Sequence, residues 1–422
     1  MAPRARARRS LRAAAAAWGL LALGGGAAAL PASGGVARVS SDTVRLNVEG
    51  AASSGVSLAA SGREVVVTWA ASAAGRTDVY AAVSRDEAAS FGPATRVNDL
   101  AGDARTSGEQ APRVAVGKAI DVVWSSKAGS AARIRVAKWR PGDTTFAPAT
   151  TVHAENLPGA RGWASVAADG DGAVHLAWLD GRAAAGPGAA PRTMRQDIFQ
   201  AVWRPDGSHD EVTVATDVCF CCKTAVAIAP DGTTYVAWRH IYPTNLRDIA
   251  VARSTDGGKT FSAPVRVSED GWQIAGCPDD GPAVAVDDAG VLHVVWPRMV
   301  SGPNPAKGVF YSYSMDGGRT FAARQRVDDE GGAAAHPQIA AGGGRVAVVW
   351  DQAAASRRAC LREISSHPKA SRWTPRMGVV AVLSDGPAVY PAIAATSTAL
   401  VAAWTETTPN GSDIRVRRLG RD

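Results

Sequence analysis

The stretch "VVVTW" (residues 65–69) decides the fold, because the chain contains seven segments of this kind. Each apolar segment ends in a tryptophan, at Trp69, Trp124, Trp178, Trp238, Trp296, Trp350 and Trp404, and successive tryptophans lie 55, 54, 60, 58, 54 and 54 residues apart. Segments rich in β-branched residues, separated by Gly, Pro and Asp turns and repeated at such a period, are typical of a β-propeller. We therefore expect one blade for each tryptophan.

Three further segments recur around each tryptophan segment and complete a four-stranded blade. One precedes it ("PRVAV", 112–116), one follows it ("DIAVARS", 248–254) and one comes last ("GPATRVN", 92–98). The seventh unit ends after its third strand, and "TVRLNV" (43–48) resembles the missing fourth strand, whose pairing would hide two sheet edges. The sequence predicts an all-β fold, a single seven-bladed propeller over residues 43–419 closed by an N-terminal strand. Six blades with one irregular unit are the alternative.

The N-terminal segment has the composition of an export signal. Five arginines precede an apolar run from Ala13 to about Leu30, and small residues with Pro31 follow. We expect residues 1–32 to be a cleaved signal peptide and residues 33–42 to be a linker. The protein is then periplasmic or secreted, by the Sec route, although Arg8-Arg9 before Ser10-Leu11 resembles a twin-arginine (Tat) signal.

Charge and cysteine content restrict the possible partners. The formal charge is +7, and five of those charges lie in the expected signal peptide, which leaves about +2 for the mature chain. Because no other basic run is present, we expect no nucleic-acid partner, no membrane association after cleavage, and a monomer. The chain has 5 cysteines, an odd number, so at least one lacks a partner within the chain in an oxidising compartment.

Two turns between predicted third and fourth strands carry a specific pattern, "STDGGKTF" (254–261) and "SMDGGRTF" (314–321), and "SRDEAASF" (84–91) is a degenerate copy. Ser and Asp side chains bond the turn backbone, and glycine supplies positive φ. The pattern resembles the Asp-box, S-x-D-x-G-x-T-[FW], of the sialidase-like (BNR-repeat) propellers. The resemblance implies that these turns stabilise the fold and lie on the face opposite the active site.

Two groups of loops should share the other face, because the chain reverses at every turn of an antiparallel blade. The loops after the tryptophan strands carry Asp180, Arg182, Arg239, His240, Arg298, Asp351 and Glu406. The loops before the innermost strands carry Glu109, Arg161, Trp163, Cys221, Cys222, Asp279, Asp280, His336 and Tyr390. We call this the functional face and expect its residues to surround the mouth of the central channel.

Four cysteines should converge at this mouth. Cys219, Cys221 and Cys222 precede the innermost strand of the fourth blade, and Cys277 precedes that of the fifth. The first hypothesis is a disulfide from Cys277 to one of the other three. The second is a thiolate site for a soft metal, copper or zinc, with His240 or His336 nearby. The third is a redox or nucleophilic thiol. The fifth cysteine, Cys360, is expected in the third strand of the sixth blade, buried.

The resemblance to sialidases implies a set of catalytic roles. In that family arginines bind the substrate carboxylate through paired hydrogen bonds, a tyrosine activated by a glutamate is the nucleophile, and an aspartic acid is the general acid and base. Tyr390 would then be the nucleophile, Glu406 its activating base and Asp180 the acid. The arginines on the expected functional face are Arg161, Arg182, Arg239 and Arg298.

These observations give one leading hypothesis and two alternatives. The leading hypothesis is an exported sialidase-like propeller that recognises a glycan or another anionic small molecule at the channel mouth; as an enzyme it would be a glycoside hydrolase of the exo-α-sialidase type. One alternative is a non-catalytic periplasmic protein that holds a soft metal through Cys219, Cys221, Cys222 and Cys277. The other is an interaction scaffold that uses the propeller rim.

Overall fold

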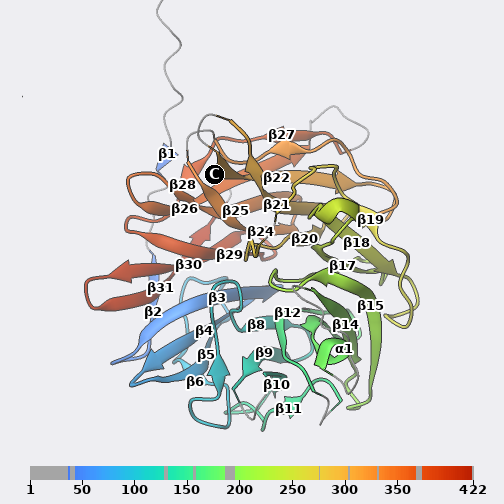
Figure 1. The fold of residues 1–422 in the computed structure, drawn as a ribbon. Helices are drawn as coiled ribbons and strands as arrows, with labels where there is room; N and C mark the ends of the chain where they lie inside the picture. Colours follow the sequence, from blue (N-terminus) through green and yellow to red (C-terminus); the bar gives the residue numbers. More distant parts are fainter. Residues whose placement is uncertain are drawn as a thin grey trace, which may run out of the picture. The chain divides into compact units, whose positions relative to one another are not determined.

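The seven tryptophan segments form the second strands of seven separate antiparallel sheets (Figure 1). The computed structural model describes residues 37–38, 43–127, 132–154, 158–185, 195–274, 276–302, 305–329, 332–366 and 373–420. Residues 1–36 lie outside this description, so the signal peptide stays a prediction. The seven sheets confirm the seven-bladed propeller and rule out the six-bladed alternative.

The first four blades follow the chain from residue 52 to residue 266. Blade one contains β3 (Ala52–Ser61), β4 (Glu64–Ala73), β5 (Arg76–Ser84) and β6 (Thr95–Arg96), and blade two contains β7 (Ala104–Arg105), β8 (Arg113–Val116), β9 (Ile120–Ser126), β10 (Arg133–Trp139) and β11 (Thr150–Thr151). Blade three contains β12 (Arg161–Ala168), β13 (Val174–Asp180), β14 (Arg195–Trp203) and β15 (His209–Cys219), and blade four contains β16 (Ala225–Ile228), β17 (Thr234–Arg239), β18 (Ile249–Ser254) and β19 (Val265–Arg266). Two short helical turns, α1 (Arg182–Ala185) and a 3-10 turn (Pro243–Asn245), follow β13 and β17.

The last three blades complete the ring. Blade five contains β20 (Ala283–Val286), β21 (Leu292–Val300), β22 (Ala306–Ser314) and β23 (Gln325–Arg326). Blade six contains β24 (Ala334–Gly342), β25 (Arg345–Ala353), β26 (Arg357–Ser366), β27 (Pro375–Met377) and β28 (Ala381–Val382). Blade seven contains β29 (Ala388–Ala395), β30 (Leu400–Thr408), β31 (Gly411–Leu419) and, from the other end of the chain, β2 (Val44–Leu46). A further strand, β1 (Ala37–Arg38), pairs in parallel with β28, so the segment that we expected to be a linker adds a strand to blade six.

Each blade tryptophan is buried between its own blade and the preceding one. The seven indoles are at most 1% exposed, and each belongs to an apolar cluster that joins two adjacent blades. Trp296, for example, packs against Ile249 and Val251 of blade four. Burying a side chain of this size contributes roughly 5 kcal/mol of hydrophobic free energy, so the repeat places one large contribution in every blade interface.

The N-terminal strand closes the ring, as the sequence predicts. β2 pairs with β31 in antiparallel register, with Val44 opposite Val416 and Leu46 opposite Ile414. In Figure 1 the blue β2 lies beside the red β31. The described residues contain no helix long and apolar enough to cross a bilayer.

Candidate functional site

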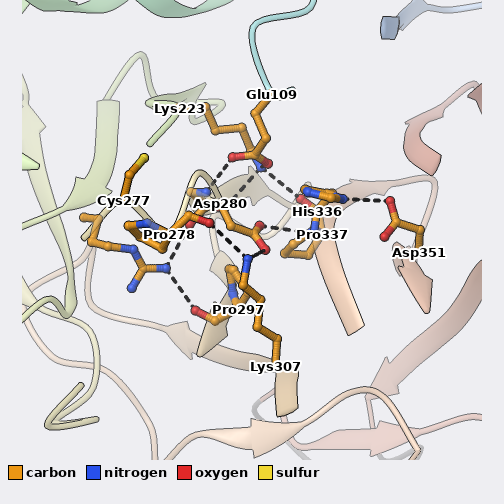
Figure 2. Close-up of polar contacts among 12 residues, drawn as sticks. Glu109, Lys223, Cys277, Pro278, Asp280, Pro297, Lys307, His336, Pro337 and Asp351 are labelled. Carbon is orange, nitrogen blue, oxygen red and sulfur yellow. Dashed lines mark hydrogen bonds and ion pairs between the residues drawn. The ribbon is translucent and has the colours of Figure 1, made fainter. Parts of the chain in front are cut away.

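The innermost strands of the seven blades surround a cavity of about 180 Å³ on the propeller axis. Residues of all seven blades line it: Ser57, Leu58, Arg113, Val114, Ser165, Val166, Lys223, Thr224, Ala225, Val226, Pro282, Ala283, Val284, Gln338, Ile339 and Ile393. On the functional face, Lys223 and Glu109 form an ion pair in which both side chains are buried. Glu109 Oε2 also accepts from the backbone N–H of Gly281 at 2.6 Å, and Figure 2 shows this group beside Asp280. The pair therefore links blades two, four and five at the channel mouth.

Backbone bulges at the start of three innermost strands contain side chains of the channel mouth. The pairing register shifts between Gly162 and Ser165, between Ala335 and Gln338, and between Val389 and Ala392, each time where an innermost strand begins. Within these bulges lie Trp163 (φ 52°), His336 (φ 54°) and Tyr390 (φ 50°), all in the left-handed region, and Asp279 (φ 43°) precedes the innermost strand of blade five. Bulges commonly aim a side chain next to an active site, and left-handed non-glycine residues concentrate there. We call Trp163, Asp279, His336 and Tyr390 the mouth cluster.

The members of the mouth cluster come from four blades and meet in space. The rings of His336 and Tyr390 have centroids 4.1 Å apart. Asp279 and Tyr390 both reach Gly108, where a Cβ atom would lie 2.5 Å from Asp279 Oδ2 and 3.6 Å from Tyr390 Oη. Gly108 has φ 50°, so both its backbone and its surroundings favour glycine. The fold therefore brings side chains of different blades together at one place, as a binding or active site requires.

Two buried carboxylates hold His336 and Tyr390 in place. Asp351 Oδ2 accepts from His336 Nδ1 at 2.8 Å and from the backbone N–H of Tyr390 at 2.8 Å. Asp280 Oδ1 accepts from the backbone N–H of His336 at 3.1 Å (Figure 2). Because Nδ1 is engaged by Asp351, Nε2 is the nitrogen of His336 that can exchange a proton with a ligand.

The mouth cluster has shifted pKa values that suit proton transfer. Burial lowers the pKa of His336, but its hydrogen bond to Asp351 and the charges of Asp280 and Asp351 outweigh burial and raise it. Burial and then the charge of Asp279 raise the pKa of Tyr390 to about 12, so its hydroxyl is protonated at neutral pH. Burial, together with the charge of Glu109, also raises the pKa of Asp279. Several groups with shifted pKa values at one place are typical of an active site.

The structure does not support the expected arginine clamp. Arg239 is buried, and its guanidinium donates to the carbonyl oxygens of Arg247 at 2.8 Å and of Asp280 and Pro297 at 2.9 Å each. It lies over the ring of Trp272. Since these donors hold three segments of backbone together, Nη1 and Nη2 of Arg239 are occupied within the protein, and its substrate-binding role stays a prediction.

Asp180, Arg161 and Arg182 satisfy one another in blade three. Asp180 Oδ2 accepts from Arg161 Nε at 3.2 Å, from Arg182 Nη2 at 2.6 Å and from Trp178 Nε1 at 2.9 Å. Burial alone would raise the pKa of Asp180, but the hydrogen bonds from Arg182 and Trp178 outweigh it and lower the pKa. The lowered pKa favours the ionised form of Asp180, and Arg161 and Arg182 both bond its carboxylate, so the general-acid and substrate-binding roles of these three residues stay predictions.

The expected pairing of Tyr390 with Glu406 is also absent from the described residues. Glu406 accepts from Trp404 Nε1 at 3.2 Å and from Arg415 Nε at 3.1 Å, and no hydrogen bond joins it to Tyr390. Glu406 is therefore not placed to activate Tyr390 in this structure, and the nucleophilic role of Tyr390 stays a prediction. Arg298 is half-buried, lies over the ring of Phe310 and makes no side-chain hydrogen bond within the described part of the chain.

The sulfur atoms converge as the sequence predicts, and a disulfide is present. Cys221 is bonded to Cys277, while Cys219, Cys222 and Cys360 are free and buried. The predicted set of four thiolates is therefore not available, because two of its sulfur atoms are bonded to each other. The histidines do not complete a metal site either: His240 Nδ1 accepts from Trp238 Nε1 at 3.1 Å, and His336 belongs to the mouth cluster. Burial raises the pKa of Cys360 to about 12.

Comparisons with known proteins identify other proteins with this fold but assign the chain to no family. No family model matches the chain, and no curated protein matches it significantly. An ulvan lyase of polysaccharide lyase family PL25, solved bound to -[GlcA(1-4)Rha3S]-, is 11% identical over 89% of this chain and 96% of its own, with a TM-score of 0.57. A protein of unknown function from Dyadobacter fermentans is 13% identical over 92% of this chain and 100% of its own, with a TM-score of 0.50. A mutant Trypanosoma rangeli sialidase displaying trans-sialidase activity is 12% identical over 91% of this chain and 60% of its own, with a TM-score of 0.50. The chain thus has the propeller fold of sialidases and polysaccharide lyases, which confirms the sialidase-like resemblance at the level of fold.

Proposed function

We propose that this protein is an exported, carbohydrate-acting propeller whose mouth cluster binds a glycan and transfers protons on it. The observation that carries the proposal is the placement of Asp279, His336 and Tyr390, which have left-handed φ angles at the start of the innermost strands of three successive blades. Such backbone strain costs roughly 1–3 kcal/mol per residue, and it is typically retained where a side chain must be presented to a ligand.

The chemistry of the mouth cluster favours acid–base catalysis over nucleophilic attack. Nδ1 of His336 is bonded to Asp351, which leaves Nε2 to exchange a proton with a ligand, and this hydrogen bond raises the pKa of His336 against the effect of burial. Tyr390 has a neutral hydroxyl at neutral pH, and its ring packs at a tilt against that of His336, so it can donate a proton close to the point where His336 accepts one. Asp279 is a second acid, because burial favours its protonated form.

Three further observations support a glycan as the ligand. Trp163, half-buried in the mouth cluster, offers an indole of the kind that packs against sugar rings. The solved structures that share the propeller fold include a polysaccharide lyase and a sialidase, whose names refer to carbohydrate substrates. Arg298, which makes no side-chain hydrogen bond within the described residues, is the arginine of the functional face that remains able to contact an acidic sugar.

The test uses the mature protein with three probes: a sialoside, a glucuronic acid-containing polysaccharide and a neutral polysaccharide. Hydrolysis is followed by new reducing ends, and elimination by the ultraviolet absorbance of an unsaturated product. We expect turnover of an acidic probe, and we expect Tyr390→Phe and His336→Asn each to lower kcat by about 100-fold or more, since proton transfer by a positioned side chain supplies that range.

Tyr313→Phe is the matched control, because Tyr313 lies in β22, in register with His293 and outside the mouth cluster. It should keep wild-type activity. The proposal is rejected if no probe binds the wild-type protein, or if Tyr390→Phe and His336→Asn both keep full activity on a probe that is turned over. An activity lost equally in all three variants would point to a general loss of folding and would also count against the mouth cluster.

A further inference from the structure

The buried thiols of Cys219 and Cys222 lie in contact with the disulfide. Their Sγ atoms are 3.8 Å apart, and the Sγ atoms of Cys219, Cys221 and Cys222 all lie within 4.8 Å of one another. Cys221 is in turn bonded to Cys277. A C-x-x-C dithiol therefore lies beside a disulfide, within the short distance that a small side-chain rotation covers.

A positive charge is directed at one of the two thiols. Arg247 is buried, and its Nη1 lies 3.1 Å from Cys219 Sγ while its Nε donates to Asn245 Oδ1 at 2.9 Å. The guanidinium of Arg239 adds to the positive potential around both sulfur atoms. Within the described residues no carboxylate is hydrogen-bonded to either guanidinium. A buried arginine without an acidic partner favours a thiolate as its counter-ion.

The two thiols therefore differ in character. The hydrogen bond from Cys222, and then the charges of Arg239 and Arg247, lower the pKa of Cys219 to about 6 against the effect of burial. Burial, and then the hydrogen bond to Cys219, raise the pKa of Cys222. Cys219 is the nucleophile of the pair at neutral pH, and Cys222 keeps its proton until the second step.

We propose that these four cysteines form a thiol–disulfide exchange site in which the Cys219/Cys222 dithiol reduces the Cys221–Cys277 disulfide. Cys219 thiolate attacks Cys221 Sγ; the Cys219–Cys221 bond forms as the Cys221–Cys277 bond breaks, and Cys277 leaves as a thiolate that takes a proton from water. Cys222 then loses its proton and attacks Cys219 Sγ, which forms the Cys219–Cys222 bond and releases Cys221. Two thiols and one disulfide are present before and after, so no external oxidant or reductant is needed.

The exchange would remove the covalent link between two segments of the channel mouth. In the first form the disulfide ties the segment before β16 to the segment before β20, and in the second form both bonded cysteines lie before β16. Cys277 lies two residues before Asp279, and the neighbouring carbonyl of Pro278 accepts from Lys307 Nζ at 3.0 Å (Figure 2). The exchange thus releases the segment that carries one member of the mouth cluster. The exchange itself does not depend on the proposed carbohydrate activity.

The experiment measures whether Cys277 becomes free without added reductant. The folded protein is equilibrated without free thiols, alkylated, digested and analysed by mass spectrometry; Cys277 is exposed, so its thiol is accessible once released. We expect a fraction of Cys277 to be alkylated in the wild-type protein. Cys219→Ser, which removes the nucleophile, should lower that fraction by about tenfold. Cys222→Ser, which removes only the resolving thiol, should still release Cys277 and should leave Cys219 bonded to Cys221. Cys360→Ser, which alters a buried thiol of blade six, should leave it unchanged.

Thiol counting in denaturant supplies an independent measurement. Both exchange forms keep three thiols, Cys360 and two of the other four. A count of one would show that Cys219 and Cys222 are already oxidised beside the Cys221–Cys277 disulfide, and this would overturn the proposal. Cys277 alkylation that is absent from wild type, or that is equal in wild type and in Cys219→Ser, would overturn it as well. Tryptophan fluorescence and the thermal midpoint establish that each variant is folded, and two variants keep the test valid if one of them misfolds.

Discussion

At the scale of the residue, buried carboxylates explain how strained backbone is tolerated at the mouth. Left-handed φ is unfavourable for a residue with a Cβ atom, yet His336 and Tyr390 both adopt it. In each case the backbone N–H at the bulge, which has no partner in the strand ladder, donates to a buried aspartate: Asp280 for His336 and Asp351 for Tyr390. A charge-assisted hydrogen bond in a dry environment offsets a strain of this size.

Asp351→Asn tests this arrangement. The hydrogen bond and the negative charge of Asp351 raise the pKa of His336. The Asp351→Asn substitution removes that charge, so it should lower the pKa of His336, which NMR of the histidine ring measures. A raised pKa means that protonated His336 stabilises the folded state below pH 6.5, and this contribution is lost as the pH rises through the raised value. The stability difference between wild type and Asp351→Asn should therefore include a part that shrinks above that pH. The pKa of His153, which burial lowers, should not move; an unchanged pKa of His336 would contradict the arrangement.

At the scale of the element, the Ser-x-Asp turns show how a short sequence pattern fixes a local structure. In the turn after β22, Ser314 Oγ donates to Asp316 Oδ1 at 2.7 Å and accepts from the backbone N–H of Gly318 at 2.8 Å. Asp316 also accepts from the backbone N–H and the hydroxyl of Thr320. The turn after β18 repeats these contacts, and in the degenerate turn after β5 Ser90 replaces the threonine.

Asp316→Asn should destabilise the protein by about 1–2 kcal/mol at neutral pH, because it weakens hydrogen bonds to a charged acceptor. Burial opposes the shift, but the hydrogen bonds from Thr320 and Ser314 lower the pKa of Asp316 to about 2. A lowered pKa means that the stabilisation is present above the ordinary value of 3.8 and is lost as the pH falls through about 2. Urea unfolding at several pH values measures this. Asp288→Asn, at an exposed aspartate, is the control, and a destabilisation that does not depend on pH would contradict the explanation.

At the scale of the whole molecule, stability depends on closing the ring between blades one and seven. β2 supplies the outer strand of blade seven, and Arg45 bonds Asp413 of the neighbouring β31 at 2.8 Å. Glu87 of blade one bonds Thr398 and Arg418 of blade seven. These contacts connect the two ends of the chain, so they hold the ring closed where the C-terminal strands β29, β30 and β31 have no peptide connection to blade one.

A chain that begins at Glu49 should have a lower thermal midpoint and should self-associate, because β31 becomes an unpaired edge strand. A chain that begins at Val36 is the control, since it lacks only residues 1–35 and keeps both β1 and β2. Leu46→Ala within the full chain should cost roughly 2–3 kcal/mol, because Leu46 is buried in the cluster between blades one and seven. An equal thermal midpoint for all three proteins and wild type would show that β2 does not close the ring in solution.

The functional face could be predicted from the sequence, but the roles of its residues could not. Chain reversal at each turn places His336, Tyr390 and Asp279 on one face, and that follows from their spacing to the blade tryptophans. The partner of a side chain depends on what lies opposite it in the neighbouring blade. Arg239 meets carbonyl oxygens and Glu406 meets Arg415, and no local pattern distinguishes these arginines and glutamates from substrate-binding ones.

Lys223 is a residue of the channel mouth that the sequence analysis did not identify. It follows Cys222 directly, and attention to the cysteines obscured a lysine whose buried ion pair with Glu109 lies at the channel mouth. A usable signal did exist for the mouth cluster: His336 and Tyr390 both lie 14 residues before the tryptophan of their blade, as does Gly55, which also has positive φ. Glycine at one copy of a repeated position indicates a left-handed backbone at the others.

The sequence was enough to predict seven blades, with six as the alternative, and the face on which the polar loops lie, because both follow from a repeat period and from chain reversal at each turn. Only the packing of the blades shows that Cys221 is the partner of Cys277, that Arg239 donates to backbone carbonyl oxygens, and that Asp279 and Tyr390 meet beside Gly108. Those outcomes depend on which side chains of different blades approach within a few ångströms, and that distance is set by how the blades pack around the axis.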